Sequence, residues 1–267
     1  MPGDRRLQIL AVAHLALGVL TGVLAPVELR TLFEFKHILI VPLFASAFCQ
    51  SFLLSLWGAA SQAMLWKRLA GLVTGVLYLE ALAGDFRREF PGIWTITITV
   101  TMGCLLVLRR FGVIVKRQAD LGQPARPEPK GPRFSIRGMM IVTAAVALLC
   151  AEARALQSFG VQRFLLNLVC AICFVAVGLV SLWAALGDAR PLRRGPAVFV
   201  SSLVLGAFLA VPAHTAGRVY IHLIMVLYPT ALMGSLLIVR SCGYRLVRRA
   251  SAEWIGLLCS APARQEG

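Results

Sequence analysis

A few polar side chains interrupt long apolar segments of this sequence, and their chemistry is the first candidate for a function. His14, Glu80 and Asn167 each lie within a run of mostly apolar residues. Imidazole, carboxylate and carboxamide groups can bind a solute or relay a proton. Placing a charged group at mid-bilayer costs at least about 2.5–3.5 kcal/mol on insertion scales, so such residues need a reason. These three residues form a candidate buried polar path.

A second group of polar side chains lies near the ends of the apolar segments. With the orientation argued below, they would face the outer side of a membrane: Glu34, His37, Glu89, His214, Tyr220 and His222. Imidazole and carboxylate are common ligands of borderline metal ions, so a shallow external cation or metal site is one interpretation. Interfacial side chains that face water explain the same pattern. The spacing matches no established metal motif, and the sequence predicts no cofactor and no catalytic residue.

The composition indicates what kind of protein must position these side chains. Apolar residues make up 58% of the chain and charged residues only 15%, and the mean hydropathy is +0.79. A bilayer core about 30 Å thick needs roughly 20 mostly apolar residues per helix. Eight segments fit, and we expect an all-α integral membrane protein. The predicted spans are Leu7–Ala25, Lys36–Trp57, Leu69–Gly84, Pro91–Leu108, Gly138–Leu156, Phe164–Gly187, Ala197–Ala213 and Val219–Val239.

The sequence also repeats itself. Met102–Gly112 returns as Met233–Gly243 at an offset of 131 (233 − 102), with Met, Gly, two Leu, Arg and Gly in register. Independently, Ser55-Leu56-Trp57 returns as Ser181-Leu182-Trp183 at an offset of 126 (181 − 55). These matches predict two homologous four-span halves. The expected domains are 1–117, a Pro-rich linker at 118–132, 133–249, and a tail at 250–267.

The distribution of basic residues predicts the orientation. Most of the 27 Lys and Arg residues fall at the N-terminus, in 67–68, 109–137 and 190–194, and in the tail from 240 onward. Cytoplasmic flanks carry such an excess, so both termini and the linker are expected inside. An even number of spans per half makes the two halves parallel. The net charge of +15 follows from this pattern, and no nucleic-acid partner is expected.

Several local patterns lead to further expectations. The run Thr95–Thr101 alternates like a strand, but an open strand edge in lipid would leave its backbone unpaired, so we predict a helix with Thr hydroxyls bonded to the preceding turn. Gly71 and Gly75 form a small-xxx-small pattern for close helix packing, and Gly103 and Gly234 recur at one repeat position for the same expected reason.

Residues at the predicted span ends are expected to meet the membrane interface. Tryptophans near span ends act as interface anchors, and we assign that role to Trp57, Trp66, Trp94 and Trp183. The basic, partly apolar stretches Arg109–Arg117 and Gly243–Leu258 are expected to lie in the inner interface, where anionic lipids attract them.

One local resemblance concerns the start of the second half. Arg133-Phe134-Ser135-Ile136-Arg137 leads directly into the apolar run from Gly138. This segment resembles a juxtamembrane motif and span of uncharacterised small membrane proteins from planctomycete-type bacteria, although Gly138 stands where a Thr is usual there. The resemblance implies a bacterial inner-membrane setting and no particular activity.

Three functions remain open from the sequence. The first is a non-enzymatic multi-pass protein with a structural, regulatory or assembly-related role, working through lipids and through a membrane-protein partner or a second copy. The second is a small-solute or ion transporter with its path at the repeat interface, near His14, Glu80 and Asn167. The third is a membrane metal or haem protein that uses His37, His214 and His222. A bis-His haem would need two histidines at matched depth, and only His14 is expected to be buried.

Overall fold

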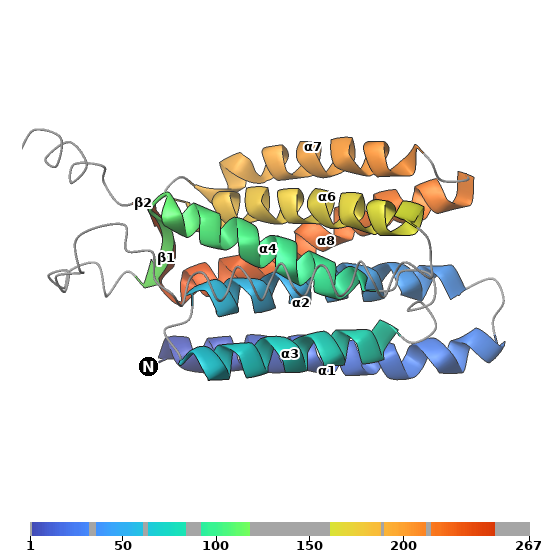
Figure 1. The fold of residues 1–267 in the computed structure, drawn as a ribbon, viewed down its shortest axis with the longest axis horizontal. Helices are drawn as coiled ribbons and strands as arrows, with labels where there is room; N and C mark the ends of the chain where they lie inside the picture. The colour runs from blue at the N-terminus through green and yellow to red at the C-terminus, as the bar shows by residue number, and fades with distance from the viewer. Residues whose placement is uncertain are drawn as a thin grey trace, which may run out of the picture.

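The structure is a computed structural model that describes residues 2–31, 36–60, 64–83, 92–117, 161–187, 190–211 and 215–248. These parts of the chain form an elongated helical bundle with a two-stranded sheet at one end (Figure 1). Its elements are α1 (Pro2–Thr31), α2 (Lys36–Ala60), α3 (Leu65–Ala83), α4 (Ile93–Arg110), β1 (Val113–Arg117), α6 (Val161–Leu186), α7 (Pro191–Ala210), α8 (Thr215–Ser241) and β2 (Tyr244–Arg248).

The apolar character of these helices makes this a helical membrane protein. Four segments are long and apolar enough to cross a bilayer, by length and composition: Ile93–Arg110, Phe164–Leu186, Arg193–Ala210 and Arg218–Ser241. The first three predicted spans lie on α1, α2 and α3, which do not meet the same criterion within the described residues. The fifth predicted span, 138–156, lies outside those residues. The eight-span prediction is therefore supported only for four of its spans.

The threonine-rich segment is helical, as predicted. Thr95–Thr101 lies within α4, where the Thr97 hydroxyl donates to the Ile93 carbonyl at 2.7 Å and the Thr101 hydroxyl donates to the Thr97 carbonyl at 2.6 Å. Each bond satisfies a hydroxyl that would otherwise be unpaired in an apolar setting. Helical backbone bonding therefore overrides the alternating pattern of this segment.

The two basic stretches that follow α4 and α8 are paired strands in their first residues. β1 and β2 run antiparallel, with Val113 opposite Arg248 and Lys116 opposite Arg245. Each strand follows a turn at a glycine with positive φ, 80° at Gly112 and 89° at Gly243, a conformation that only glycine adopts at low cost. The sequence did not predict this pairing, and the expected position of the two stretches in the inner interface stays a prediction. We call the β1–β2 pair the ribbon.

Elements that lie at the two sequence offsets run in the same direction along the bundle and share one arginine contact. α2 and α6 both end at the ribbon end of the bundle, α3 and α7 begin there, and α4 and α8 end there (Figure 1). The Arg109 guanidinium donates to the Ala59 carbonyl at 3.0 Å, and its counterpart Arg240 donates to the Ala185 carbonyl at 2.8 Å. Arg109 and Arg240 are related by 131 residues, and Ala59 and Ala185 by 126.

The core lies among α2, α4, α6 and α8, while α1 and α3 pack against α2, and α7 against α6 and α8. Phe48 and Phe174 stack at its centre, with ring centroids 3.6 Å apart and planes 7° apart. Tyr228 meets both rings edge-on and donates to the Phe174 carbonyl at 3.1 Å. Trp94 packs on Phe48, with ring centroids 4.9 Å apart, and the residue is only 3% exposed. The prediction that Trp94 anchors the chain at the interface is therefore wrong.

The glycines divide into packed and open positions. A methyl group at Gly71 would press on the Trp57 ring, and one at Gly75 on the Leu54 side chain, so α3 approaches α2 closely at both positions. This agrees with the predicted small-xxx-small contact. A methyl group at Gly103 or Gly234 would meet no atom of the described residues within 4 Å. Close packing is therefore the wrong explanation for that recurring pair.

Candidate functional site

The half-buried histidine of α1 bonds to α8, the last helix of the bundle. His14 Nε2 and Ser235 Oγ lie 2.8 Å apart, joining α1 to α8. The Ser235 hydroxyl lies 2.9 Å from the Ala231 carbonyl, and when its proton is donated to that carbonyl its oxygen accepts from His14 Nε2. In the neutral imidazole, the proton is therefore on Nε2, and Nδ1 is left as an acceptor. The sequence identified His14 but not the serine 221 positions away.

Two further side chains complete this cluster. Gln50 of α2 donates from Nε2 to the His14 carbonyl at 2.8 Å and to the Ser46 hydroxyl at 3.3 Å. The Tyr78 hydroxyl of α3 donates to the Leu15 carbonyl at 3.4 Å. Gly18 of α1 makes room for that tyrosine, because an added methyl group would overlap its hydroxyl. We call His14, Gln50, Tyr78 and Ser235 the polar site.

The polar site contains two buried acceptors without a partner. His14 Nδ1 and Gln50 Oε1 are both shielded from solvent and bond to no atom of the described residues. Most buried polar atoms in folded proteins are paired, so two orphans in one cluster require an explanation. Both atoms have lone pairs and no proton, so a hydrogen-bond donor is what they lack.

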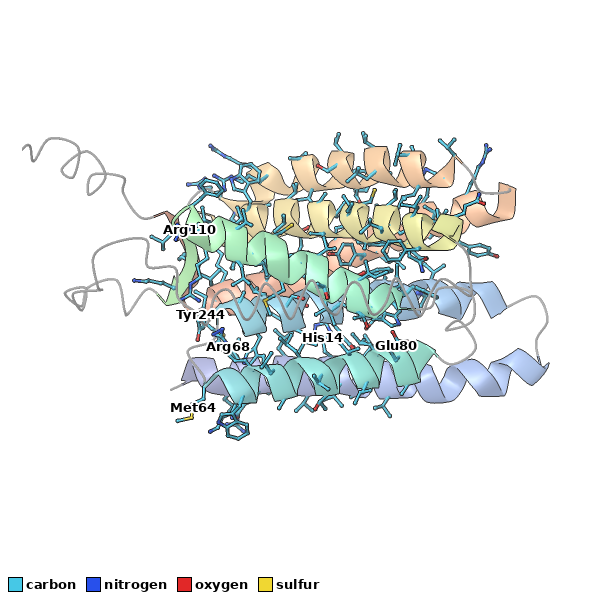
Figure 2. The ribbon with its side chains drawn as sticks, viewed as in Figure 1. His14, Met64, Arg68, Glu80, Arg110 and Tyr244 are labelled. Carbon is cyan, nitrogen blue, oxygen red and sulfur yellow. The ribbon has the colours of Figure 1, made fainter. Side chains whose placement is uncertain are left out.

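The remaining members of the predicted polar path lie on other elements. Glu80 is partly exposed on α3, and Asn167 is 2% exposed on α6. In Figure 2, Arg68, His14 and Glu80 lie at successive levels along the bundle, from the ribbon end outward. Of the three predicted residues, His14 is the one placed in the polar site. A continuous path through all three remains a prediction.

Most of the predicted outer-face cluster lies outside the described structure. Glu34, Glu89 and His214 are not among the described residues, and neither is the side chain of His37. His222 Nδ1 bonds to the Arg218 carbonyl of its own helix at 2.7 Å, and Tyr220 is half-buried on α8. Within the described residues, no group of three His, Cys, Asp or Glu side chains is arranged to hold a metal ion.

Sequence reasoning missed Gln50, Tyr78 and Ser235, although the repeat contains a signal for the first two. At the offset of 126, Gln50 corresponds to Ala176 and Tyr78 to Val204, and Ser46 corresponds to Ile172. The first half is polar where the second half is apolar. Helices α6 and α7 therefore form with apolar residues at the positions that the offset matches to Gln50 and Tyr78. Ser235 corresponds to Cys104 at the offset of 131, which gives no such signal.

Comparison of the chain with protein-family models, with curated proteins and with solved structures finds no match. Function must therefore be argued from the site and the fold themselves.

Proposed function

We propose that the chain is a multi-pass protein of a bacterial cytoplasmic membrane with a structural, regulatory or assembly-related role. In this proposal it consists of two parallel four-span halves and acts through its contacts with lipids and with a membrane partner or a second copy. The observation that carries the proposal is the packed aromatic centre between the halves.

The central stack supports a role other than solute transport. In a transporter built of two repeats, the substrate site is expected near the membrane midplane at the repeat interface. Here that interface holds Phe48 from one half stacked on its counterpart Phe174 from the other, related by 126 residues. Trp94 and Tyr228 pack against the pair, and both are almost completely buried. A polar solute would have to displace this cluster at a large cost in burial.

The paired contacts support the two-half architecture. The ribbon joins two strands related by the offset of 131: Val113 and Tyr244 each begin a strand directly after an equivalent glycine, and Val115 lies opposite Leu246, its counterpart. The carbonyls at the ends of α2 and α6 accept from equivalent arginines. Such agreement at both offsets is what a duplicated unit folding twice would produce.

The charges at the ribbon end support an inside location for that end. Arg109, Arg110, Lys116, Arg240 and Arg245 all lie there, on the helix ends and the ribbon. The Arg194 guanidinium at the start of α7 stacks over the Trp183 ring, 4.1 Å from its centroid. Tryptophan with arginine at one level is typical of a membrane interface, and the basic excess is typical of the cytoplasmic side. Anionic headgroups of the inner leaflet are the expected partners of these cations.

Reconstitution tests the proposal. The purified protein is placed in liposomes, and ion flux, small-solute flux and total metal content are measured against empty liposomes. We expect no flux above the control. Flux that disappears in Glu80→Gln or His14→Ala would support the transporter alternative and overturn the proposal. A stoichiometric amount of bound metal would support the metal-protein alternative and would also overturn the proposal. Because the expected result is negative, proteins that co-purify in mild detergent should then be identified and tested for loss with Lys116→Gln and Arg245→Gln.

A further inference from the structure

We propose that the polar site binds a bilayer-borne molecule that presents a hydroxyl group as a hydrogen-bond donor. The site belongs to the first half alone, and the inference goes beyond the structural role proposed above. It rests on two buried acceptors, on the apolar residues at the equivalent positions of the second half, and on the exposure of α1.

The chemistry of the orphaned atoms selects a donor. With the Ser235 proton donated to the Ala231 carbonyl, His14 Nε2 carries the ring proton and Nδ1 is an acceptor in the neutral ring. Gln50 uses its amide nitrogen for the His14 carbonyl and Ser46, so its oxygen remains free to accept. An acceptor buried without a partner loses its bond to water and gains nothing in return. A ligand with one O–H group restores one such bond, and a second hydroxyl restores the other.

Neutrality favours a hydroxyl over a cation. The imidazole in this tautomer, the carboxamide and both hydroxyls of the polar site carry no charge. A full charge brought to this depth would have to be compensated, whereas an O–H group satisfies a lone pair without that cost. The rest of the molecule then lies in surroundings that are apolar.

The position of the site determines from where the ligand comes. Leu15 and Leu17, the neighbours of His14 along α1, are 56% and 46% exposed, and Val12 is 66% exposed. In a membrane these side chains face lipid. Tyr78 is partly exposed on α3 beside them. The aromatic centre, by contrast, is closed. The polar site therefore lies beside the lipid-facing surface of α1 and α3. Its two acceptor atoms are covered in the structure, so a long-chain alcohol would insert its hydroxyl by displacing the side chains that cover them, while its chain stays in lipid.

The second half shows that the polar residues are an addition. Its helices α6 and α7 are equivalent to α2 and α3, and they carry Ala176 and Val204 in place of Gln50 and Tyr78. This comparison also supplies a substitution that an equivalent helix already accommodates, Gln50→Ala. A matched control is Ser201→Ala on α7, which removes an exposed hydroxyl that bonds only to the Ala197 carbonyl of its own helix.

The test is photolabelling of the full chain in lipid nanodiscs. The probe is hexadecanol with a diazirine in its chain, and the matched probe is its methyl ether, which has the same chain and an acceptor oxygen but no donor. Labelled peptides are mapped by mass spectrometry. We expect the alcohol, and not the ether, to label peptides that contain His14, Gln50 or Tyr78. Removing one hydrogen bond weakens binding about fivefold, so labelling at subsaturating probe should fall by about that factor in Gln50→Ala and His14→Leu and remain unchanged in Ser201→Ala.

Competition in the unaltered protein keeps the test decisive if a variant fails to fold. Excess unlabelled hexadecanol should abolish the labelling, and its methyl ether should not. Glycerol distinguishes the source, since competition by glycerol would mean an aqueous polyol site and would overturn the bilayer-borne ligand. Equal labelling by alcohol and ether, or full labelling in Gln50→Ala, would mean that water or the protein itself satisfies the two acceptors. Either result would overturn the proposal.

Discussion

The two arginine contacts at the ribbon end give a quantitative prediction, because within the described residues Arg240 makes two such bonds and Arg109 makes one. Arg240 Nη1 donates to the Ala185 carbonyl at 2.8 Å and to the Gly187 carbonyl at 2.6 Å. Arg109 Nη1 donates to the Ala59 carbonyl at 3.0 Å. The accepting carbonyls lie at the ends of α6 and α2, where the last turn of a helix has no backbone donors and carries partial negative charge.

A hydrogen bond from a charged donor contributes about 1.5–3 kcal/mol. Two such bonds, reduced for partial exposure, predict that Arg240→Ala lowers the free energy of unfolding by about 2–4 kcal/mol. Arg109 is more exposed and makes one of these bonds, so Arg109→Ala should cost about 1 kcal/mol. Arg240→Lys should be intermediate, since an ammonium keeps the charge but loses the planar fork.

The assay is reversible unfolding in mixed micelles of dodecyl maltoside and increasing dodecyl sulfate, followed by tryptophan fluorescence. Arg110→Ala is the control, because Arg110 is exposed in the last turn of α4 and should change stability by less than about 0.5 kcal/mol. An equal loss in Arg240→Ala and Arg110→Ala would refute the reasoning. A larger loss in Arg109→Ala than in Arg240→Ala would refute it as well.

Other substitutions test the core and the turns. Phe48→Ala and Phe174→Ala should each lower the free energy of unfolding by about 3–5 kcal/mol. A double-mutant cycle should show a coupling energy of about 0.5–1.5 kcal/mol between the two stacked rings. Additive losses would contradict the stacked geometry. Gly112→Ala and Gly243→Ala should each lower the free energy of unfolding by about 1–2 kcal/mol, because both glycines have positive φ values. Gly234→Ala is the control, since its added methyl group would meet no atom of the described residues within 4 Å. An equal loss in all three variants would contradict the assigned turns. Gly18→Ala should lower thermal stability in detergent by displacing Tyr78, and Tyr78→Phe should relieve most of that loss, because the overlapping atom is the Tyr78 hydroxyl; a loss that persists in full in the double variant would contradict this contact.

The helices could be predicted because each leaves a long local signature. Runs of apolar residues place all seven described helices with ends within six residues of those observed, since a helix satisfies its own backbone bonds and needs no distant partner. The same argument explains why α4 was correctly predicted as a helix in spite of its alternating threonines. The fifth predicted span lies outside the described residues and stays a prediction.

The ribbon and the polar site could not be predicted from local patterns. β1 and β2 are five residues each, and either alone is too short and too basic to indicate a strand. Their pairing depends on the way the bundle brings two chain segments together. Trp94 lies near a helix end in sequence, but tertiary packing turns it into the core beside Phe48. Ser235 lies 221 residues from His14, and only the packing of α1 on α8 reveals the pair.

The most direct test of the two-half account is a cross-link within the ribbon. Lys116 and Arg245 lie directly opposite each other on β1 and β2, and opposed antiparallel residues have Cα atoms about 4.5–5.5 Å apart, within disulfide reach. In a cysteine-free background, Lys116→Cys with Arg245→Cys should form an intrachain disulfide on mild oxidation. An impermeant maleimide should reach each single cysteine only from the cytoplasmic side. Failure to cross-link, or labelling of the two positions from opposite sides of the membrane, would contradict two parallel halves that meet at the inner face.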